Sequence, residues 1–296
     1  FCLFIQSTNS LNLMTAEEIA SEIDLSGKTI LITGCSSGIG FETMRVLAER
    51  GARILALART IGKAEIVCDK IEGDCVPISC DLSNFSNIEK AVKSIDEPID
   101  VIIANAGVMA VQDLVLHHNV ESQMFVNHFA HFHLVTSLMP LLKDKGRVIT
   151  VSSGAHAYAR SSGIALDDLN WERSVYKPWS AYGQSKLANI LFAKALAKRL
   201  NKGQTSNALH PGVIKTELWR HLPDNGASYD LKPVENGAAT SVYLAVSPEV
   251  EGTTGQYFKD CMVATPVDIA QNEELAEALW QKSEELVKNL KADLKL

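Results

Sequence analysis

The stretch that decides the fold is Lys28-Thr-Ile-Leu-Ile-Thr-Gly34-Cys-Ser-Ser-Gly38-Ile-Gly40. The apolar run at 28–33 predicts a strand, and residues 41–50 predict a helix. Gly34 permits a tight turn, Gly38 lets the backbone approach a pyrophosphate, and Gly40 allows close helix–strand packing. The N-terminus of the helix supplies N–H groups and positive potential. We therefore predict a phosphate-binding turn, with Gly-x3-Gly-x-Gly spacing instead of G-x-G-x-x-G, made of Gly34, Ser36, Ser37, Gly38, Ile39 and Gly40.

Outward from this turn, apolar runs and amphipathic stretches keep alternating. The runs lack polar alternation, as is typical of buried parallel strands. We predict an α/β fold, namely a doubly wound, Rossmann-type parallel sheet of about seven strands flanked by helices, in a single domain at 28–296. Further strands are predicted at 53–58, 76–80, 99–104, 147–152, 206–210 and 255–258, and helices at 61–71, 84–94 with Ser83 as cap, 113–142, 180–200 and 236–245, before a last amphipathic helix.

Residues 1–27 are predicted to form an N-terminal extension with a short helix. Thr15-Ala-Glu-Glu18 is typical of a capping box. Residues 1–13 could be an upstream extension, a cloning remnant or a short docking arm, and they lack the basic region of a signal peptide. No apolar run approaches the roughly 18 residues that span a bilayer. We expect no transmembrane segment and a cytoplasmic location.

Composition narrows the class of protein. The 296 residues are 46% hydrophobic, which is enough for a full core, and the net charge of -7 argues against nucleic-acid binding. The six cysteines show no C-x-x-C spacing, so a reduced, intracellular chain is expected. Cys75 and Cys80 are expected to be buried thiols. His128, His131 and His133 fall on one predicted helix, where we expect a polar surface near the sheet edge or a subunit interface, and no metal site.

Tyr182 and Lys186 are four residues apart on a predicted helix and therefore share a face. A free tyrosine has a pKa of about 10, and bringing it near 7 requires about 4 kcal/mol. One cation about 4 Å away supplies on the order of 4 kcal/mol at an effective dielectric near 20. The pair suits a general acid/base, while a half-exposed tyrosine beside a solvated lysine is the alternative.

The second predicted strand ends at Leu57-Ala58-Arg59-Thr60. Enzymes that bind NAD place an acid about 20 residues after the glycine turn, where it holds the ribose 2′-hydroxyl. This chain has Arg59 there, and an arginine can clamp a 2′-phosphate. The sequence therefore favours NADP(H), with NAD(H) as the other possibility. The alternative interpretation of Arg59 is a solvated residue at the end of a strand.

Two long irregular stretches, 154–179 and 213–232, follow the ends of predicted strands. Ligands bind at that edge of an open α/β sheet, so we expect these to be substrate loops. The loops carry several aromatic residues, which could cover an apolar substrate or pack as core or lid, namely Tyr158, Trp171, Tyr176, Trp179 and Trp219.

Taken together, the motifs resemble the short-chain dehydrogenase/reductase family over about residues 28–260. They occur in family order, and phrases such as Val151-Ser-Ser-Gly-Ala-His156 and Ala208-Leu-His-Pro-Gly212 are similar to the retinol-dehydrogenase and WW-domain-oxidoreductase branch. The motifs that carry the resemblance are Thr33-Gly-x3-Gly-Ile-Gly40, Asn105-Ala-Gly107, Ser153, Tyr182-x3-Lys186 and Pro211-Gly212.

The resemblance implies a role for each of four residues. Tyr182 would be the general acid/base, and Lys186 would lower its pKa and bind the nicotinamide ribose. Ser153 would polarise the substrate carbonyl, and Asn127 would kink its helix and hold a water of the proton relay. The resemblance also implies a homodimer or homotetramer. It further implies that Asp81 and Leu82 contact the adenine, and that Asn105, Ala106 and Gly107 line the cofactor floor. The segment that binds the carboxamide would contain Pro211, Gly212, Val213 and Thr216.

The function expected from this resemblance is hydride transfer between NADP(H) and an alcohol or carbonyl. The substrate is expected to be apolar or amphipathic, such as a lipid aldehyde or a retinoid-like or steroid-like molecule. The alternative is a catalytically silent NAD(P)-binding interaction or regulatory protein of the same fold. The full set Asn127, Ser153, Tyr182 and Lys186 argues for the enzyme.

Overall fold

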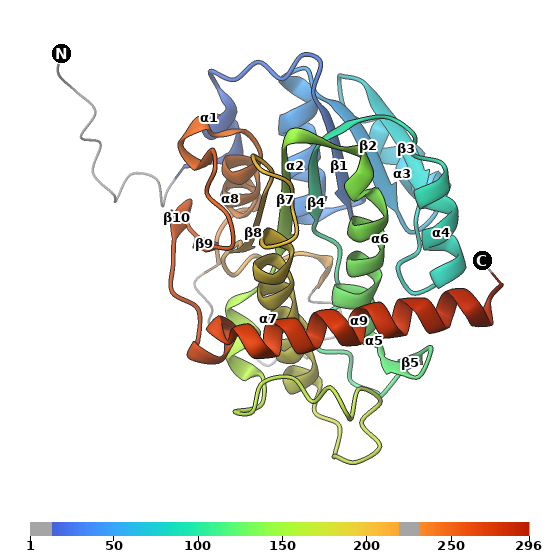
Figure 1. Ribbon diagram of the computed structural model, residues 1–296. Helices are drawn as coiled ribbons and strands as arrows, with labels where there is room; N and C mark the ends of the chain where they lie inside the picture. Colours follow the sequence, from blue (N-terminus) through green and yellow to red (C-terminus); the bar gives the residue numbers. More distant parts are fainter. Residues whose placement is uncertain (1–13, 219–230, 296) are drawn as a thin grey trace.

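The computed structural model describes residues 14–218 and 231–295, and its centre is one eight-stranded sheet (Figure 1). The strand order is β10-β9-β8-β7-β4-β1-β2-β3. Only β10 pairs antiparallel, with β9, so the predicted doubly wound parallel sheet is confirmed. The strands are β1 (Thr29–Thr33), β2 (Arg53–Ala58), β3 (Cys75–Ser79), β4 (Ile99–Ala104), β7 (Leu142–Val151), β8 (Thr205–His210), β9 (Tyr257–Lys259) and β10 (Met262–Val263).

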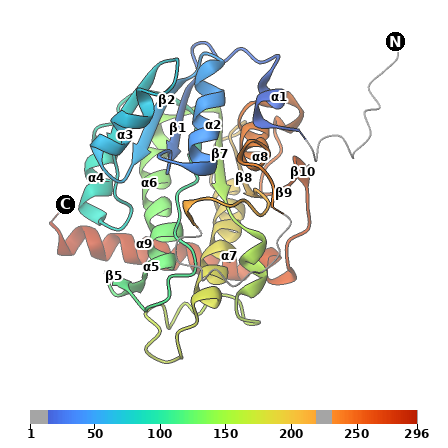
Figure 2. The ribbon, with the colours of Figure 1, turned by 180° about the vertical axis from the view of Figure 1, so that it is seen from behind.

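Helices cover both faces of the sheet, as the two opposite views show (Figures 1 and 2). Alternate side chains of β1 enter two separate cores, since Leu31 packs with one set of helices and Ile30 and Ile32 with the other. One face carries α1 (Ala16–Ala20), α2 (Gly38–Glu49), α3 (Ile61–Cys68) and α8 (Val234–Val246), and the other carries α4 (Phe85–Lys93), α6 (Ala130–Leu138), α7 (Pro178–Ala197) and α9 (Glu273–Asp293).

The helix predicted at 113–142 is wrong in its first part. A two-stranded hairpin, β5 (Leu116–His117) and β6 (Val120–Glu121), precedes α5 (Ser122–Met124) and a π-helix at Phe125–Phe129. The hairpin forms because His118 and Asn119 both take positive φ, as a tight type I′ turn requires. The cap of α4 is Asn84 instead of Ser83. The 3₁₀-helices include Met139–Leu141, Gly154–Tyr158, Pro248–Val250 and Asp268–Gln271.

The capping box is confirmed at α1. Thr15 accepts a hydrogen bond from the Glu18 amide, and the Glu18 side chain accepts one from the Thr15 amide. The helix packs on the domain through buried Ala16 and Ala20, and Glu17 pairs with Arg45. None of the helices in the described part of the chain combines the length and apolar character that crossing a membrane demands.

The expectation that the three histidines lie on a polar surface is wrong. His128, His131 and His133 are each only 1% exposed. Each ring has its own partner: His128 contacts Ser283 on α9, His131 contacts Thr33, and His133 lies 2.7 Å from Glu89. The C-terminal helix α9 lies across α6 and α7 (Figure 1). It therefore buries a face that the local sequence presents as polar.

The same helix covers α7, which bears the tyrosine. Phe192 of α7 stacks on Trp280 of α9 at 5.9 Å, and Arg199 pairs with Glu277. Pairing of α7 with its mate in a second subunit would have to displace α9. The homodimer or homotetramer expected from the resemblance stays a prediction.

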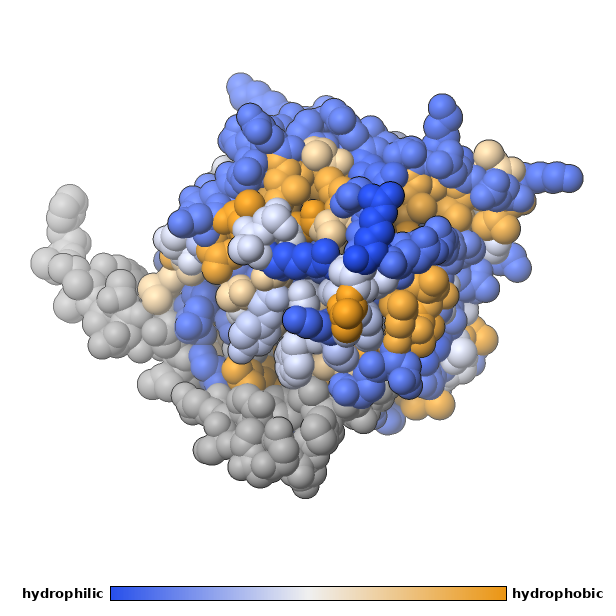
Figure 3. Space-filling view, turned by 90° about the horizontal axis from the view of Figure 1, so that it is seen from below, coloured by the Kyte–Doolittle hydropathy of each residue, from blue (hydrophilic) through white to orange (hydrophobic). Residues whose placement is uncertain are grey.

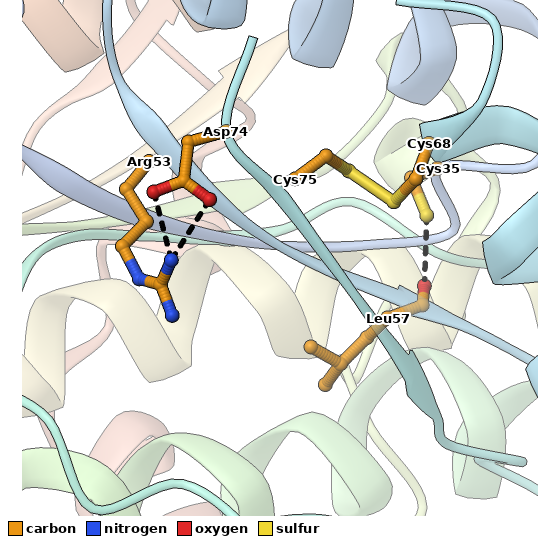
Figure 4. Close-up of a disulfide and its surroundings, with 6 residues drawn as sticks. All are labelled: Cys35, Arg53, Leu57, Cys68, Asp74 and Cys75. Carbon is orange, nitrogen blue, oxygen red and sulfur yellow. Dashed lines mark hydrogen bonds and ion pairs between the residues drawn. A yellow bond between two sulfur atoms is a disulfide. The ribbon is translucent and has the colours of Figure 1, made fainter.

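The expectation of a fully reduced chain is also wrong, because Cys68 and Cys75 form a disulfide. The two residues are at the end of α3 and the start of β3, and the packing of that helix on that strand brings their Cα atoms to 5.4 Å. The disulfide lies near the ion pair of Arg53 with Asp74, at the amino end of the strands (Figure 4). Cys80 is a buried free thiol, as expected, whereas the expectation of a buried thiol at Cys75 is wrong because that half-buried sulfur is bonded to Cys68.

Candidate active site

A cavity of about 1050 Å³ opens at the carboxyl ends of the parallel strands. This volume is at the upper end of the range for small-molecule sites, which suits a dinucleotide together with a substrate. The edge of the sheet that it occupies faces the viewer in Figure 3, where hydrophobic and hydrophilic side chains interleave. Every residue predicted to contact the cofactor lines this one cavity, whereas Asn127 does not.

The glycine turn at the start of α2 forms one wall of the cavity. Gly34 and Gly38 both have positive φ, 69° and 57°. A Cβ on Gly40 would lie 2.2 Å from the Gly34 carbonyl oxygen and 2.5 Å from Nδ2 of Asn105. The turn therefore brings bare backbone to the cavity at the N-terminus of a 12-residue helix, which is a ready anion site.

The Thr33 hydroxyl fixes the floor beneath this turn. It accepts hydrogen bonds from the backbone amides of Asn105 and Ala106, both at 3.0 Å. It also lies 2.8 Å from Nε2 of His131, whose Nδ1 lies 3.1 Å from the Asn127 carbonyl oxygen. Burial lowers the pKa of His131 to about 4, so its neutral ring connects the glycine turn to the Asn127 backbone.

Two cations stand at the far end of the cavity. Arg59 follows the last residue of β2, and Lys63 lies four residues later in the first turn of α3. Both are exposed and line the cavity beside Ser36 and Ser37. The sequence did not lead us to predict Lys63 as a cofactor-binding residue. Its position four residues after Arg59, across the start of a predicted helix, could have indicated it.

Tyr182 and Lys186 lie on α7, each 3% exposed, and both line the cavity. The Lys186 ammonium donates to the Val151 carbonyl at 3.0 Å and sits 5.7 Å from the centre of the Tyr182 ring. Burial lowers the pKa of Lys186 to about 8. Burial also raises the pKa of Tyr182 to about 12, against the opposing effect of a hydrogen bond with Ser153.

This direction corrects the expectation that Lys186 brings the pKa of Tyr182 down toward neutrality. The physical reason is desolvation: α7 is buried along the tyrosine face, and the ammonium is engaged by a carbonyl instead of the phenol. In this geometry the phenol keeps its proton at neutral pH. Ser153 meets the tyrosine as expected, because β7 ends at Val151 and the chain turns back over α7.

Asn127 lies behind the cavity wall, within the π-helix, where the expected helix irregularity occurs. Its Oδ1 accepts from the Val108 amide at 2.8 Å, and its Nδ2 donates to the Val108 carbonyl and to Ser185 Oγ, both at 2.9 Å. A Cβ on Gly107 would lie 3.1 Å from Asn127 Oδ1 and 3.5 Å from Lys186 Nζ. Asn127 therefore joins the cofactor floor to α7.

The aromatic residues of the long loops divide into two groups. Trp179 and Tyr158 line the cavity, packed edge to face at 5.9 Å. Trp171 is instead 7% exposed and packs against Tyr176 and Arg160, so its role is structural. Trp219 and the rest of the loop at 219–230 lie outside the described residues. Other apolar residues of the lining include Met109, Val111, Val115, Val126, Ala155 and Leu218.

Two further histidines lie near Ser153, namely His156 and His210. The sequence predicted no role for either of them. The nearest signal was the phrase Ala208-Leu-His-Pro-Gly212, in which His210 stands two residues before the glycine predicted to contact the cofactor. Within residues 14–218 and 231–295, no group of three or more His, Cys, Asp or Glu side chains is arranged to hold a metal ion.

Comparison with known proteins places this geometry in a family. The model of the short chain dehydrogenase family matches residues 28–165. Short-chain dehydrogenase TIC 32 B, chloroplastic, of Brassica napus is 37% identical over 93% of both chains, and human retinol dehydrogenase 13 is 37% identical over 93% of this chain and 88% of its own. A solved structure of an uncharacterised protein from Mycobacterium paratuberculosis, 33% identical, superposes with a TM-score of 0.78 over 91% of this chain and 97% of its own. The chain therefore belongs to the short-chain dehydrogenase/reductase family of oxidoreductases, in its retinol-dehydrogenase-like branch.

Proposed function

We propose that the protein transfers a hydride between NADP(H) and an alcohol or carbonyl substrate, with Tyr182 as the general acid/base. The observation that carries this proposal is that Ser153, Tyr182 and Lys186 meet in the same cavity as the glycine turn. A hydride transfer needs a proton donor, a group that polarises the carbonyl and a nucleotide site side by side.

The lining of the cavity fits the cofactor. The N-terminus of α2 and the bare glycine backbone suit a pyrophosphate, and a Cβ on Gly34 would meet Ala106 Cα at 2.7 Å. Arg59 and Lys63 would hold a 2′-phosphate, while Asp81 and Leu82 line the cavity beyond them. When bound, NADP(H) supplies or accepts the hydride.

The residues of the chain handle the proton. The Ser153 side chain lies close enough to the Tyr182 phenol to lower its pKa, so both hydroxyls can reach one carbonyl oxygen of a substrate. Because burial raises the pKa of Tyr182 to about 12, the phenol is protonated at neutral pH and is ready to donate. Alcohol oxidation instead needs the phenolate, so the rate of that direction is expected to rise with pH up to the pKa of the loaded site.

Several apolar side chains line the cavity together with Tyr182. Met109 is buried, and Val115 and Trp179 are 41% and 39% exposed where they line the cavity. One relative with 37% identity is named a retinol dehydrogenase. We therefore propose an apolar or amphipathic substrate, such as a lipid aldehyde or a retinoid-like or steroid-like molecule.

The substrate class can be tested with NADPH and a series of unbranched aldehydes of increasing length. The value of kcat/KM is expected to rise about fourfold per added CH₂, the equivalent of about 0.8 kcal/mol, until the apolar lining is covered. The measurement is the loss of NADPH absorbance at each chain length. A series that is flat, or that favours short hydroxylated substrates, would contradict the apolar assignment.

The cofactor preference depends on Arg59 and Lys63. Arg59→Ala is expected to raise the Kd for NADPH roughly 10–100-fold, because a charge-assisted hydrogen bond contributes about 1.5–3 kcal/mol. Lys63→Ala should act in the same direction. The Kd for NADH should stay within about twofold in both variants, since NADH has no 2′-phosphate.

The matched control for the cofactor test is Lys70→Ala, which removes an exposed lysine just beyond α3 that does not line the cavity. Its Kd for both cofactors should equal that of the wild type. Tighter binding of NADH than NADPH by the wild type would overturn the preference for NADPH.

The cytoplasmic location stays a prediction, and the Brassica relative is named as chloroplastic.

A further inference from the structure

Two histidines hold the peptide group that follows Ser153. Nδ1 of His156 lies 2.7 Å from the Ser153 carbonyl oxygen. The amide of Gly154, at the other end of the same peptide group, donates to Nδ1 of His210 at 3.0 Å. His156 comes from the 3₁₀-helix at Gly154–Tyr158, and His210 is the last residue of β8.

The surrounding hydrogen bonds fix which nitrogen of each ring carries the proton. The amide of Val267 donates to Nε2 of His156 at 3.1 Å, so this nitrogen has no proton and Nδ1 is the donor to Ser153. Nδ1 of His210 accepts from Gly154, so the proton of that ring is on Nε2. The two neutral rings are therefore opposite tautomers.

The environment keeps both rings neutral. His156 is 6% exposed and packs edge to face on Tyr257 at 5.3 Å. Burial lowers the pKa of His156, and burial together with Lys259 lowers the pKa of His210 to about 4. The other ionisable groups that act on His210 are Asp260, His156 and Lys232, and Lys232 is paired with Asp260 at 2.6 Å.

We propose that His156 and His210 are positioning residues that together orient Ser153 toward Tyr182. This inference rests on the proposed function of Ser153 as the group that polarises the carbonyl. Ser153 has extended backbone, with φ -162° and ψ 155°, and its side chain caps the following 3₁₀-helix. Fixing both ends of its peptide group fixes the direction of its Cβ, and so the place of its hydroxyl in the cavity.

The space around Gly154 supports the same arrangement. A Cβ at position 154 would lie 3.3 Å from Nε2 of His210, which is tight, so the glycine lets the imidazole pack directly on the backbone. Ser152 is held independently, because its amide donates to the Leu209 carbonyl at 2.7 Å and its hydroxyl to the Lys186 carbonyl at 2.6 Å. The histidines therefore act on a peptide group that lies beyond the end of β7.

Protonation of the His156 and His210 rings would break the hydrogen bonds that these rings accept from the backbone. A proton on Nδ1 of His210 would face the Gly154 N–H, and a proton on Nε2 of His156 would face the Val267 N–H. Since the pKa of both rings is lowered in the folded state, the stabilisation is complete above the unfolded pKa of about 6.5. It is lost as the pH falls from there toward the folded pKa, which is about 4 for His210.

The test compares variants that differ in hydrogen bonding. His210→Ala is expected to lower kcat on the order of 10–100-fold, with the Kd for NADPH unchanged, because Ser153 is misplaced. His210→Asn should recover kcat to within about threefold, since an amide oxygen can accept from Gly154 without titrating. His156→Asn keeps a donor for the Ser153 carbonyl and should fall between these values. The control is His118→Asn, an exposed histidine in the β5–β6 turn, which should match the wild type.

The wild type supplies a readout that does not depend on activity. Nitrogen NMR of ¹⁵N-histidine-labelled protein should show the Nδ1–H tautomer for His156 and the Nε2–H tautomer for His210, with neither ring titrating near pH 6.5. The same tautomer in both rings, or unchanged kcat in His210→Ala, would overturn the inference. Expected tautomers in a wild type that shows no turnover would instead count against the proposed function, and would leave the two-histidine arrangement supported.

Discussion

Tyr182→Phe is expected to lower kcat for carbonyl reduction roughly 10²–10⁴-fold, the usual contribution of a positioned general acid. The substitution removes only the hydroxyl, so the ring can still pack edge to face on Trp179 at 6.0 Å. The Kd for NADPH and the thermal midpoint are expected to stay close to the wild type. Steady-state kinetics and a binding titration on the same preparation measure the two effects separately.

Tyr243→Phe is the matched control for this change. It also removes one phenolic hydroxyl, bonded to Glu249 at 2.9 Å, but it lies on α8 and does not line the cavity. Its kcat should equal that of the wild type. If the wild type and Tyr182→Phe instead share one background rate while both bind NADPH, the chain is a nucleotide-binding interaction protein and the enzyme proposal fails.

The parts of the fold that follow from local chemistry could be predicted from the sequence. The capping box at Thr15–Glu18, the glycine turn after β1 and the i,i+4 pair on α7 all depend on residues close together in the chain. The strand–helix alternation then places the ends of β1, β4, β7 and β8 at one edge of the sheet. The order of the family motifs was enough to predict that Ser153 and Tyr182 lie in the same site.

The features that the sequence did not predict depend on packing between segments that are far apart in the chain. Local sequence patterns carry no information about such packing. His128 is buried in part because α9, some 150 residues later, brings Ser283 to its ring. Cys68 and Cys75 meet because α3 packs on β3. The pKa of Tyr182 was expected to fall because the lysine is close in sequence, but burial of both groups decides the direction.

Gly40→Ala should damage both the fold and the cofactor site. The added Cβ would lie 2.2 Å from the Gly34 carbonyl oxygen and 2.5 Å from Asn105 Nδ2, and neither atom can move alone. Asn105 is held by the Thr33 carbonyl at 2.8 Å, and Gly34 is hydrogen bonded to Leu57. We expect the free energy of unfolding to fall by about 3 kcal/mol, as for other overpacked positions. The measurement is equilibrium denaturation by urea.

The same substitution should raise the Kd for NADPH on the order of 100-fold, because the α2 N-terminus has to move away from Gly34 and Asn105 to make room for the methyl group. Gly62→Ala is the control: it adds the same methyl group in the first turn of α3, where nothing lies within 4 Å. There the alanine should raise the free energy of unfolding by about 0.5–1 kcal/mol, the ordinary gain for replacing a helical glycine. Equal losses in the two variants would show that the close approach of Gly40 to Gly34 and Asn105 is not what requires a glycine, and the contact-based account of the turn would then be wrong.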